Sequence, residues 1–95
     1  MKALEWRPMA LADRDAIMTY IAEDNLVAAL ELDEDFEAHA DRACRTPTLY
    51  KPGRTKGTRE IVVHPNYVMV YQVETAAVVI LRVLHAAQQW PLAAV

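Results

Sequence analysis

The chain has 95 residues, of which 54% are hydrophobic and only two are glycine, so it can bury the core of a single domain spanning residues 1–95 and is too apolar for a disordered tail. Its net charge of −3 argues against a protein that coats nucleic acid through its overall charge. The N-terminus lacks the apolar run of a signal peptide, no later run approaches the ~20 residues of a membrane span, and the single cysteine excludes an internal disulfide, so we expect a cytoplasmic protein without membrane contact.

The first half of the chain predicts a short strand followed by a helix. Leu4 and Trp6 alternate with Glu5 over residues 2–7, which is typical of a strand, and Pro8 suits the first turn of a helix. A helix is then expected over residues 9–24, because apolar residues recur there at three- and four-residue spacing: Ala10, Ala16, Ile17, Tyr20 and Ile21.

A second helix is expected from about Leu26 to Arg45, ending before Pro47 because proline disfavours helical geometry in the preceding residue. Its apolar stripe would pack against the first helix as an antiparallel hairpin and consists of Ala29, Leu32, Phe36, Ala40 and Ala43. Cys44 lies in the same pattern and is expected to be a small core residue.

The second helix also carries six carboxylates, which raises the question of a metal site. They are spread around more than one helical face, so a solvated acidic surface that could face a partner is the preferred interpretation, and no metal or cofactor is expected. The six are Glu31, Asp33, Glu34, Asp35, Glu37 and Asp41.

Three runs rich in β-branched and aromatic residues, 59–64, 67–73 and 77–84, are separated by breaks of a few residues and predict three consecutive antiparallel strands. A helix hairpin laid on one face of such a sheet gives an α+β fold of two layers.

Alternation along these strands predicts which apolar residues face the helices: Ile61, Val63, Tyr67, Met69, Tyr71, Val73, Val79, Leu81 and Val83. The opposite face is too apolar to be simply solvated, which suggests that another polypeptide covers it, although a register error of one residue would exchange the two sets. Its apolar members are Val62, Val68, Val70, Val78, Ile80 and Leu84.

The loop between the second helix and the sheet contains the one concentrated positive patch in an acidic protein. Lys51, Arg54, Lys56 and Arg59 fall within nine positions, beside Pro52, Gly53 and Gly57. The patch could bind a target, or it could be a soluble loop whose charges bind nothing specific.

Polar side chains with possible chemistry gather at strand ends. His64 and Tyr67 flank one turn, and His85 follows the last strand. Imidazoles, an arginine such as Arg59 and a stacking aromatic are the groups needed to bind RNA and cleave it through a 2′-hydroxyl. With regular hairpins, however, Arg59 and the other three residues would not lie at one end of the sheet, and a histidine that ends a strand is more often capped or solvated than catalytic.

Several of these segments, in this order, resemble the RelE/ParE superfamily of bacterial toxins. The segments are Pro52-Gly53-Arg54, Gly57-Thr58-Arg59-Glu60-Ile61-Val62, His64-Pro65-Asn66-Tyr67-Val68-Met69-Val70-Tyr71 and Leu81-Arg82-Val83-Leu84-His85-Ala86-Ala87-Gln88-Gln89-Trp90-Pro91. The opening residues Trp6-Arg7-Pro8 and Tyr20-Ile21-Ala22 resemble the first strand and helix of the family, so the resemblance extends from Leu4 to Pro91.

The resemblance implies a toxin of a type II toxin–antitoxin module. A cognate antitoxin would wrap the toxin with an amphipathic segment. The antitoxin would also bind operator DNA, so the toxin would associate with that DNA only indirectly, through the antitoxin. This partner would also account for the apolar second face.

The superfamily divides in mechanism between RelE-like members, which cleave mRNA on the ribosome, and ParE-like members, which inhibit DNA gyrase without being nucleases. In RelE-like members the positions of Val68 and Ala86 carry basic residues, whereas Arg59 does match a basic position. The loss of two cations would remove much of the charge that stabilises a developing phosphorane, so the resemblance favours the ParE-like branch.

Under that interpretation Arg59, His85 and Trp90 are the central site residues, and Lys51, Arg54, Lys56, Arg59 and Arg82 contact the target. One alternative is a ribosome-dependent mRNA endonuclease that uses His64, Tyr67, His85 and Trp90. The other is an inactive toxin fold kept as an interaction module, which the valine at 68 and the alanine at 86 would explain.

Overall fold

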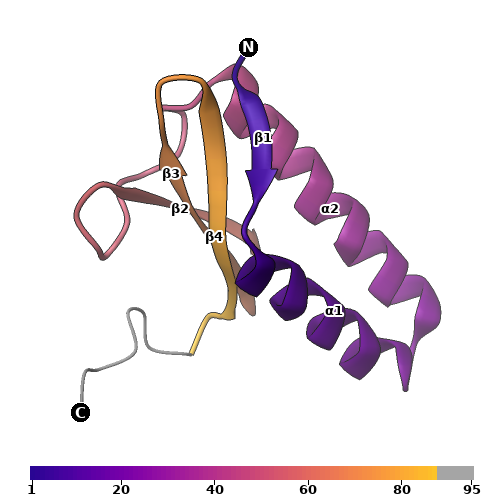
Figure 1. The fold of residues 1–95 in the computed structure, drawn as a ribbon. Coiled ribbons are helices and arrows are strands. Elements are labelled where there is room, and N and C mark those ends of the chain that lie inside the picture. Colours follow the sequence, from indigo (N-terminus) through magenta and orange to yellow (C-terminus); the bar gives the residue numbers. More distant parts are fainter. Residues whose placement is uncertain (88–95) are drawn as a thin grey trace.

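The structure is a computed structural model and describes residues 1–87. Its elements follow the order β1 (Ala3–Trp6), α1 (Pro8–Ala22), α2 (Leu26–Arg45), β2 (Thr58–His64), β3 (Tyr67–Val73) and β4 (Ala77–His85). The sheet has the strand order β1-β4-β3-β2, and the helix hairpin covers one face of it (Figure 1). The predicted α+β fold is confirmed.

The position of β1 in the sheet was not predicted. It pairs parallel with β4, from Ala3 opposite Ala77 to Trp6 opposite Ile80, whereas β2, β3 and β4 form the expected antiparallel meander. A parallel pair needs a long crossover, and here the helix hairpin and two further strands lie between β1 and its neighbour. The sheet is therefore mixed.

The buried face was predicted correctly for α2 and less well for α1. The side chain of Asn25 caps α2 by accepting a 3.0 Å hydrogen bond from the Ala28 N–H, and every residue of its predicted stripe is buried. In α1 only Ala10 is fully buried, and the predicted Tyr20 is 71% exposed. Among residues 1–87, no helix is long and apolar enough to cross a bilayer.

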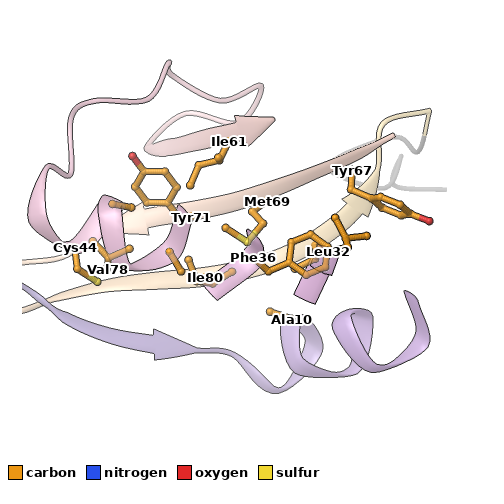
Figure 2. Packing of buried hydrophobic residues seen from close by; sticks show 13 residues of the cluster. Ala10, Leu32, Phe36, Cys44, Ile61, Tyr67, Met69, Tyr71, Val78 and Ile80 are labelled. Carbon is orange, nitrogen blue, oxygen red and sulfur yellow. The ribbon is translucent and has the colours of Figure 1, made fainter. Parts of the chain in front are cut away.

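The core lies between α2 and the sheet. Figure 2 shows Phe36 of α2 beside Met69 and Ile80 of the two central strands. Phe36 meets Tyr67 edge-on, with ring centroids 6.4 Å apart, and Cys44 is buried in the same cluster as predicted.

The hairpin is also tied together by an arginine. Arg14 of α1 donates to Asp33 and Glu37 of α2, each at 2.7 Å, and its guanidinium lies 4.4 Å from the ring centre of Trp6 on β1. Two of the six predicted solvated carboxylates therefore form helix-to-helix ion pairs.

A bulge in β4 corrects the predicted alternation of faces. Val70 pairs with Arg82, but the next residue of β3, Tyr71, pairs with Ile80, so Leu81 is the extra residue. Before the bulge Val78 and Ile80 join the core under the helices, in place of the predicted Val79 and Leu81; after it Val83 faces the core as predicted.

The apolar second face is also less available than predicted. Val68, Val70, Val79 and Leu84 lie outside the core cluster under the helices, yet each is at most 7% exposed. Val62 is the exception and is exposed. These buried valines and leucine do not themselves offer a free apolar surface to a partner.

Candidate functional site

His64, Tyr67 and His85 meet at the end of the sheet where β2 turns into β3. In the strand register His64 and His85 are both partners of Tyr67, one on each neighbouring strand. The Tyr67 ring centroid lies 6.0 Å from that of His64 and 5.6 Å from that of His85. We call these three residues the histidine end of the sheet.

Both imidazole rings are held by the backbone two residues further along. The Asn66 N–H donates to His64 Nδ1 and the Ala87 N–H donates to His85 Nδ1, each at 3.1 Å. In a neutral ring, an accepting Nδ1 leaves the proton on Nε2. In that form the Nε2–H of each exposed ring is a donor, an arrangement better suited to hydrogen bonding with a bound partner than to proton abstraction.

A cavity of about 480 Å³ opens beside this end, between α1 and the ends of β3 and β4. Ile17, Tyr67 and Val83 give it an apolar surface, and its remaining lining residues are Asp13, Ala16, Tyr20, Asn66 and His85. Its volume falls in the range of ligand pockets, about 300–1,000 Å³. The sequence prediction missed Asp13, Tyr20 and Asn66 here, because their positions in the sequence do not indicate that α1 packs beside this turn.

Arg82, a predicted target-binding residue, is instead engaged within the fold. Its Nε and one terminal nitrogen donate to the two oxygens of Asp13 at 2.8 and 3.0 Å, and the Val83 N–H donates to the same carboxylate at 2.9 Å. Both side chains of the pair are mostly buried, at 12% and 17% exposed. The hydrogen bonds to Asp13 raise the pKa of Arg82 despite its burial, so this arginine remains a charged link between α1 and β4.

Arg59 lies near the opposite end of β2, opposite Tyr71. One of its terminal nitrogens donates to the Tyr50 carbonyl at 2.6 Å. Tyr50 also contacts Tyr71 edge-on at 6.2 Å between ring centroids, and its hydroxyl is 3.0 Å from His39 Nδ1. The structure thus brings His64, Tyr67 and His85 together and leaves Arg59 apart from them.

The remaining predicted cations lie in the loop beside Arg59. Lys51, Arg54 and Lys56 are exposed, and Arg54 forms an ion pair with the buried Glu60 at 3.1 Å. Trp90, which was predicted as a central site residue, lies outside the described residues. Among residues 1–87, no three histidine, cysteine, aspartate or glutamate side chains are placed to hold a metal ion.

A two-layer α+β domain with this strand order and these segments has the architecture of a small bacterial toxin. The sequence matches the family described as "ParE toxin of type II toxin-antitoxin system, parDE" over residues 4–90. The chain belongs to this ParE toxin family.

The relatives agree with this assignment. The chain is 36% identical over 91 residues to the protein Y4kP of Sinorhizobium fredii, covering 95% of this chain and 94% of the relative. It is 37% identical over 90 residues to Toxin RelE2 of Caulobacter vibrioides, covering 93% and 99%. A chain of the chromosomal ParDE TA system from P. aeruginosa has the same fold, with a TM-score of 0.80 at 21% identity over 90% of this chain and 96% of that one.

Proposed function

We propose that this toxin acts in the cytoplasm by binding DNA gyrase and so arrests growth, and that an antitoxin encoded beside it neutralises it with an amphipathic segment. Operator DNA is then contacted by the antitoxin and only indirectly by the toxin. Membership of the ParE family supports the antitoxin partner. The choice of a binding mechanism over RNA cleavage depends on the geometry of the site.

The observation that carries this choice is the separation of the imidazoles from Arg59. His64 and Arg59 lie five residues apart on β2, which is roughly 17 Å at ~3.3 Å per residue, too far to act on one phosphate. Within residues 1–87 the nearest arginine along β4, Arg82, is neutralised by Asp13. The histidine end thus lacks a free cation to stabilise a phosphorane, and both Nδ1 lone pairs are used.

A second candidate, ribosome-dependent mRNA cleavage, is favoured by one specific feature. His64, Tyr67 and His85 converge beside an open cavity, and aromatic rings with imidazole donors can stack on and orient a nucleotide. Under this candidate Trp90, which lies outside the described residues, would also take part in the reaction.

Two assays on one preparation separate these functions. Toxin that arrests growth on expression would be added to gyrase in a DNA supercoiling assay and to a translating ribosome–mRNA mixture in which new mRNA 5′ ends are mapped. Gyrase inhibition with intact message is the expected result. Discrete cuts in the ribosomal A site with unaffected supercoiling would overturn the proposal in favour of the nuclease.

A chain that neither arrests growth nor affects either assay, although correctly folded, would instead be the inactive interaction module. Co-purification with the product of the adjacent gene, followed by recovery of activity on its removal, tests the antitoxin partner separately from the target.

A further inference from the structure

The segment 51–58, called here the basic loop, is folded tightly onto the start of β2. The Glu60 N–H donates to the Lys51 carbonyl at 3.1 Å, and the Gly53 N–H donates to the Thr58 carbonyl at 2.7 Å. Inside the loop, the N–H and the hydroxyl of Thr58 both donate to the Thr55 carbonyl, at 3.1 and 2.6 Å. The loop therefore has a fixed path, unlike a solvated linker.

Both glycines are required by this path. A Cβ at Gly53 would lie 2.3 Å from the Thr58 hydroxyl oxygen, so no side chain fits there without a shift. Gly57 has a φ of 85°, in the left-handed region that costs little only for glycine. The two glycines and the Thr55–Thr58 hydrogen bonds close the loop on itself.

Glu60 of β2 binds the middle of the loop. It is 6% exposed, and its Oε2 accepts from the Arg54 N–H at 2.7 Å and from Arg54 Nε at 3.1 Å. Burial alone would raise the pKa of Glu60, but the hydrogen bonds and charge of Arg54 outweigh it and lower the pKa. The carboxylate is thus ionised at neutral pH and holds both the backbone and the side chain of Arg54.

The charges that remain available on the loop are Lys51 and Lys56. Both are exposed, and neither forms an ion pair within residues 1–87, whereas Arg54 forms an ion pair with Glu60, whose carboxylate acts on Lys51 through charge alone. Two lysines on a chain of net charge −3 would neutralise few phosphates, and the number of neutralised phosphates sets most of the affinity of a protein for a nucleic acid backbone. They match a small acidic patch on a protein, where fixed charges steer and orient the partner.

We propose that Glu60 is a positioning residue that holds the basic loop in the conformation in which Lys51 and Lys56 bind an acidic protein surface. Only the identity of that surface, as part of gyrase, rests on the proposed function. The loop geometry and its preference for acidic polypeptide do not depend on it.

The substitution Glu60→Gln gives a test in which charge and positioning predict opposite results. It changes the net charge from −3 to −2, which by electrostatics alone strengthens binding to a polyanion. If Glu60 positions the lysines, the loop of the variant no longer has a fixed conformation. The variant then binds more weakly, because the lysines must be ordered on binding. Glu34→Gln, an exposed residue of α2, makes the same charge change without touching the loop.

The experiment titrates the isotope-labelled full chain with poly-L-glutamate at low salt and follows the amide signals of Lys51, Arg54 and Lys56 by NMR. We expect Glu60→Gln to weaken binding roughly threefold to tenfold and Glu34→Gln to leave it equal or slightly tighter. Amide exchange at Arg54 should accelerate only in Glu60→Gln, with the core amides unchanged.

The same pair of variants is then made in a Lys51→Ala, Lys56→Ala background. A positioning role predicts that Glu60→Gln causes no further loss of binding affinity in this background. A general effect on folding would instead weaken binding by the same factor as in the wild-type background. Binding by Glu60→Gln equal to or tighter than wild type, or tighter binding of wild type to a DNA duplex than to poly-L-glutamate, would overturn the inference. Failure of gyrase to bind wild-type toxin would instead refute only the proposed target.

Discussion

The two ends of β2 hold the predicted functional residues in different ways. At the histidine end the side chains are aromatic, and the exposed imidazoles are fixed only by local backbone N–H groups, next to an open cavity. At the other end, which we call the loop end, Arg59 donates to a backbone carbonyl and Arg54 pairs with the buried carboxylate of Glu60. The first end has imidazole donors without a free cation, and the second has arginines whose neighbouring imidazole, His39, contacts the Tyr50 hydroxyl.

This division shows that a chain can contain the residue types of a nuclease without having them arranged for cleavage. Phosphoryl cleavage needs the proton-transferring group and the charge-stabilising group within contact of one phosphate. Binding a protein surface has no such requirement, because separate patches can contribute to one interface. Substitutions at one end of β2 can therefore be compared with substitutions at the other.

The largest expected effect is on stability, from Asp13→Ala at the histidine end. Removing this carboxylate leaves the mostly buried Arg82 uncompensated and the Val83 N–H without its acceptor, which should cost about 3–5 kcal/mol in the free energy of unfolding. Urea denaturation measures this change in the free energy of unfolding. Asp15→Ala, an exposed residue of the same helix, is the control, and an equal loss in both variants would contradict a special role for the Asp13–Arg82 pair.

The next largest effect concerns target binding. Replacing Lys51 and Lys56 with glutamate reverses the free charges of the basic loop and should weaken gyrase inhibition at least about tenfold. Replacing His64 and His85 with alanine should change it by less than about twofold, because exposed neutral hydrogen-bond donors contribute less to an interface than two reversed charges do.

The supercoiling assay compares these two double variants, with Arg42→Glu as an exposed charge reversal elsewhere on the chain. The opposite ranking, in which the histidine variant is inactive and the lysine variant retains full inhibition, would place the functional surface at the cavity and remove the basis for the division between the two ends.

Much of the fold was predictable because its signals are local. The bounds and buried stripe of α2 follow from strong helical periodicity and the Asn25 cap, and β3 follows from its β-branched and aromatic run between turn residues. α1 was predicted less well, since its apolar residues are distributed around the helix and the exposed Tyr20 resembled a core position.

The site was predictable only in part, because its geometry depends on contacts between distant segments. Asp13 and Arg82 are 69 residues apart, and nothing in their local sequence pairs them. The bulge at Leu81 shifts the alternation of β4 by one residue, so that Val78 and Ile80 enter the core instead of Val79 and Leu81, although Leu81 itself carries no turn signal. Regular hairpins predicted that Arg59 and the other candidates would not all share one end of the sheet, but the grouping of Arg59 with His85 in one site did not allow for their lying at different ends of it.

A smaller effect is expected at the loop end from Tyr71→Phe. The buried Tyr71 hydroxyl donates to the Pro47 carbonyl at 2.6 Å and ties the start of the long loop to β3. Its loss should lower the free energy of unfolding by about 1 kcal/mol, the usual net value of one hydrogen bond. Tyr20→Phe removes an exposed hydroxyl and is the control. A thermal unfolding midpoint unchanged in both variants would show that the loop end does not need this tie.

The smallest expected effect is a pH dependence at the loop end, from His39. Burial, and then the positive charge of Arg42, lower the pKa of His39 below 6.5, against the opposing charge of Asp35. The unfolded chain therefore binds a proton at this residue at a higher pH than the folded chain does. The contribution of neutral His39 to stability is fully present above about pH 6.5 and is lost as the pH falls from there through the folded pKa.

Denaturation of wild type and His39→Gln at intervals between pH 7 and pH 5 measures this contribution. All other side chains are the same in both proteins, so the difference between the two curves isolates His39. That difference should favour wild type most at pH 7 and shrink toward pH 5, because glutamine has no proton to gain. If the difference stays constant across this range, the contact of His39 with Tyr50 does not depend on the neutral ring, and the loop end is then held through Tyr71, Glu60 and Arg59 alone.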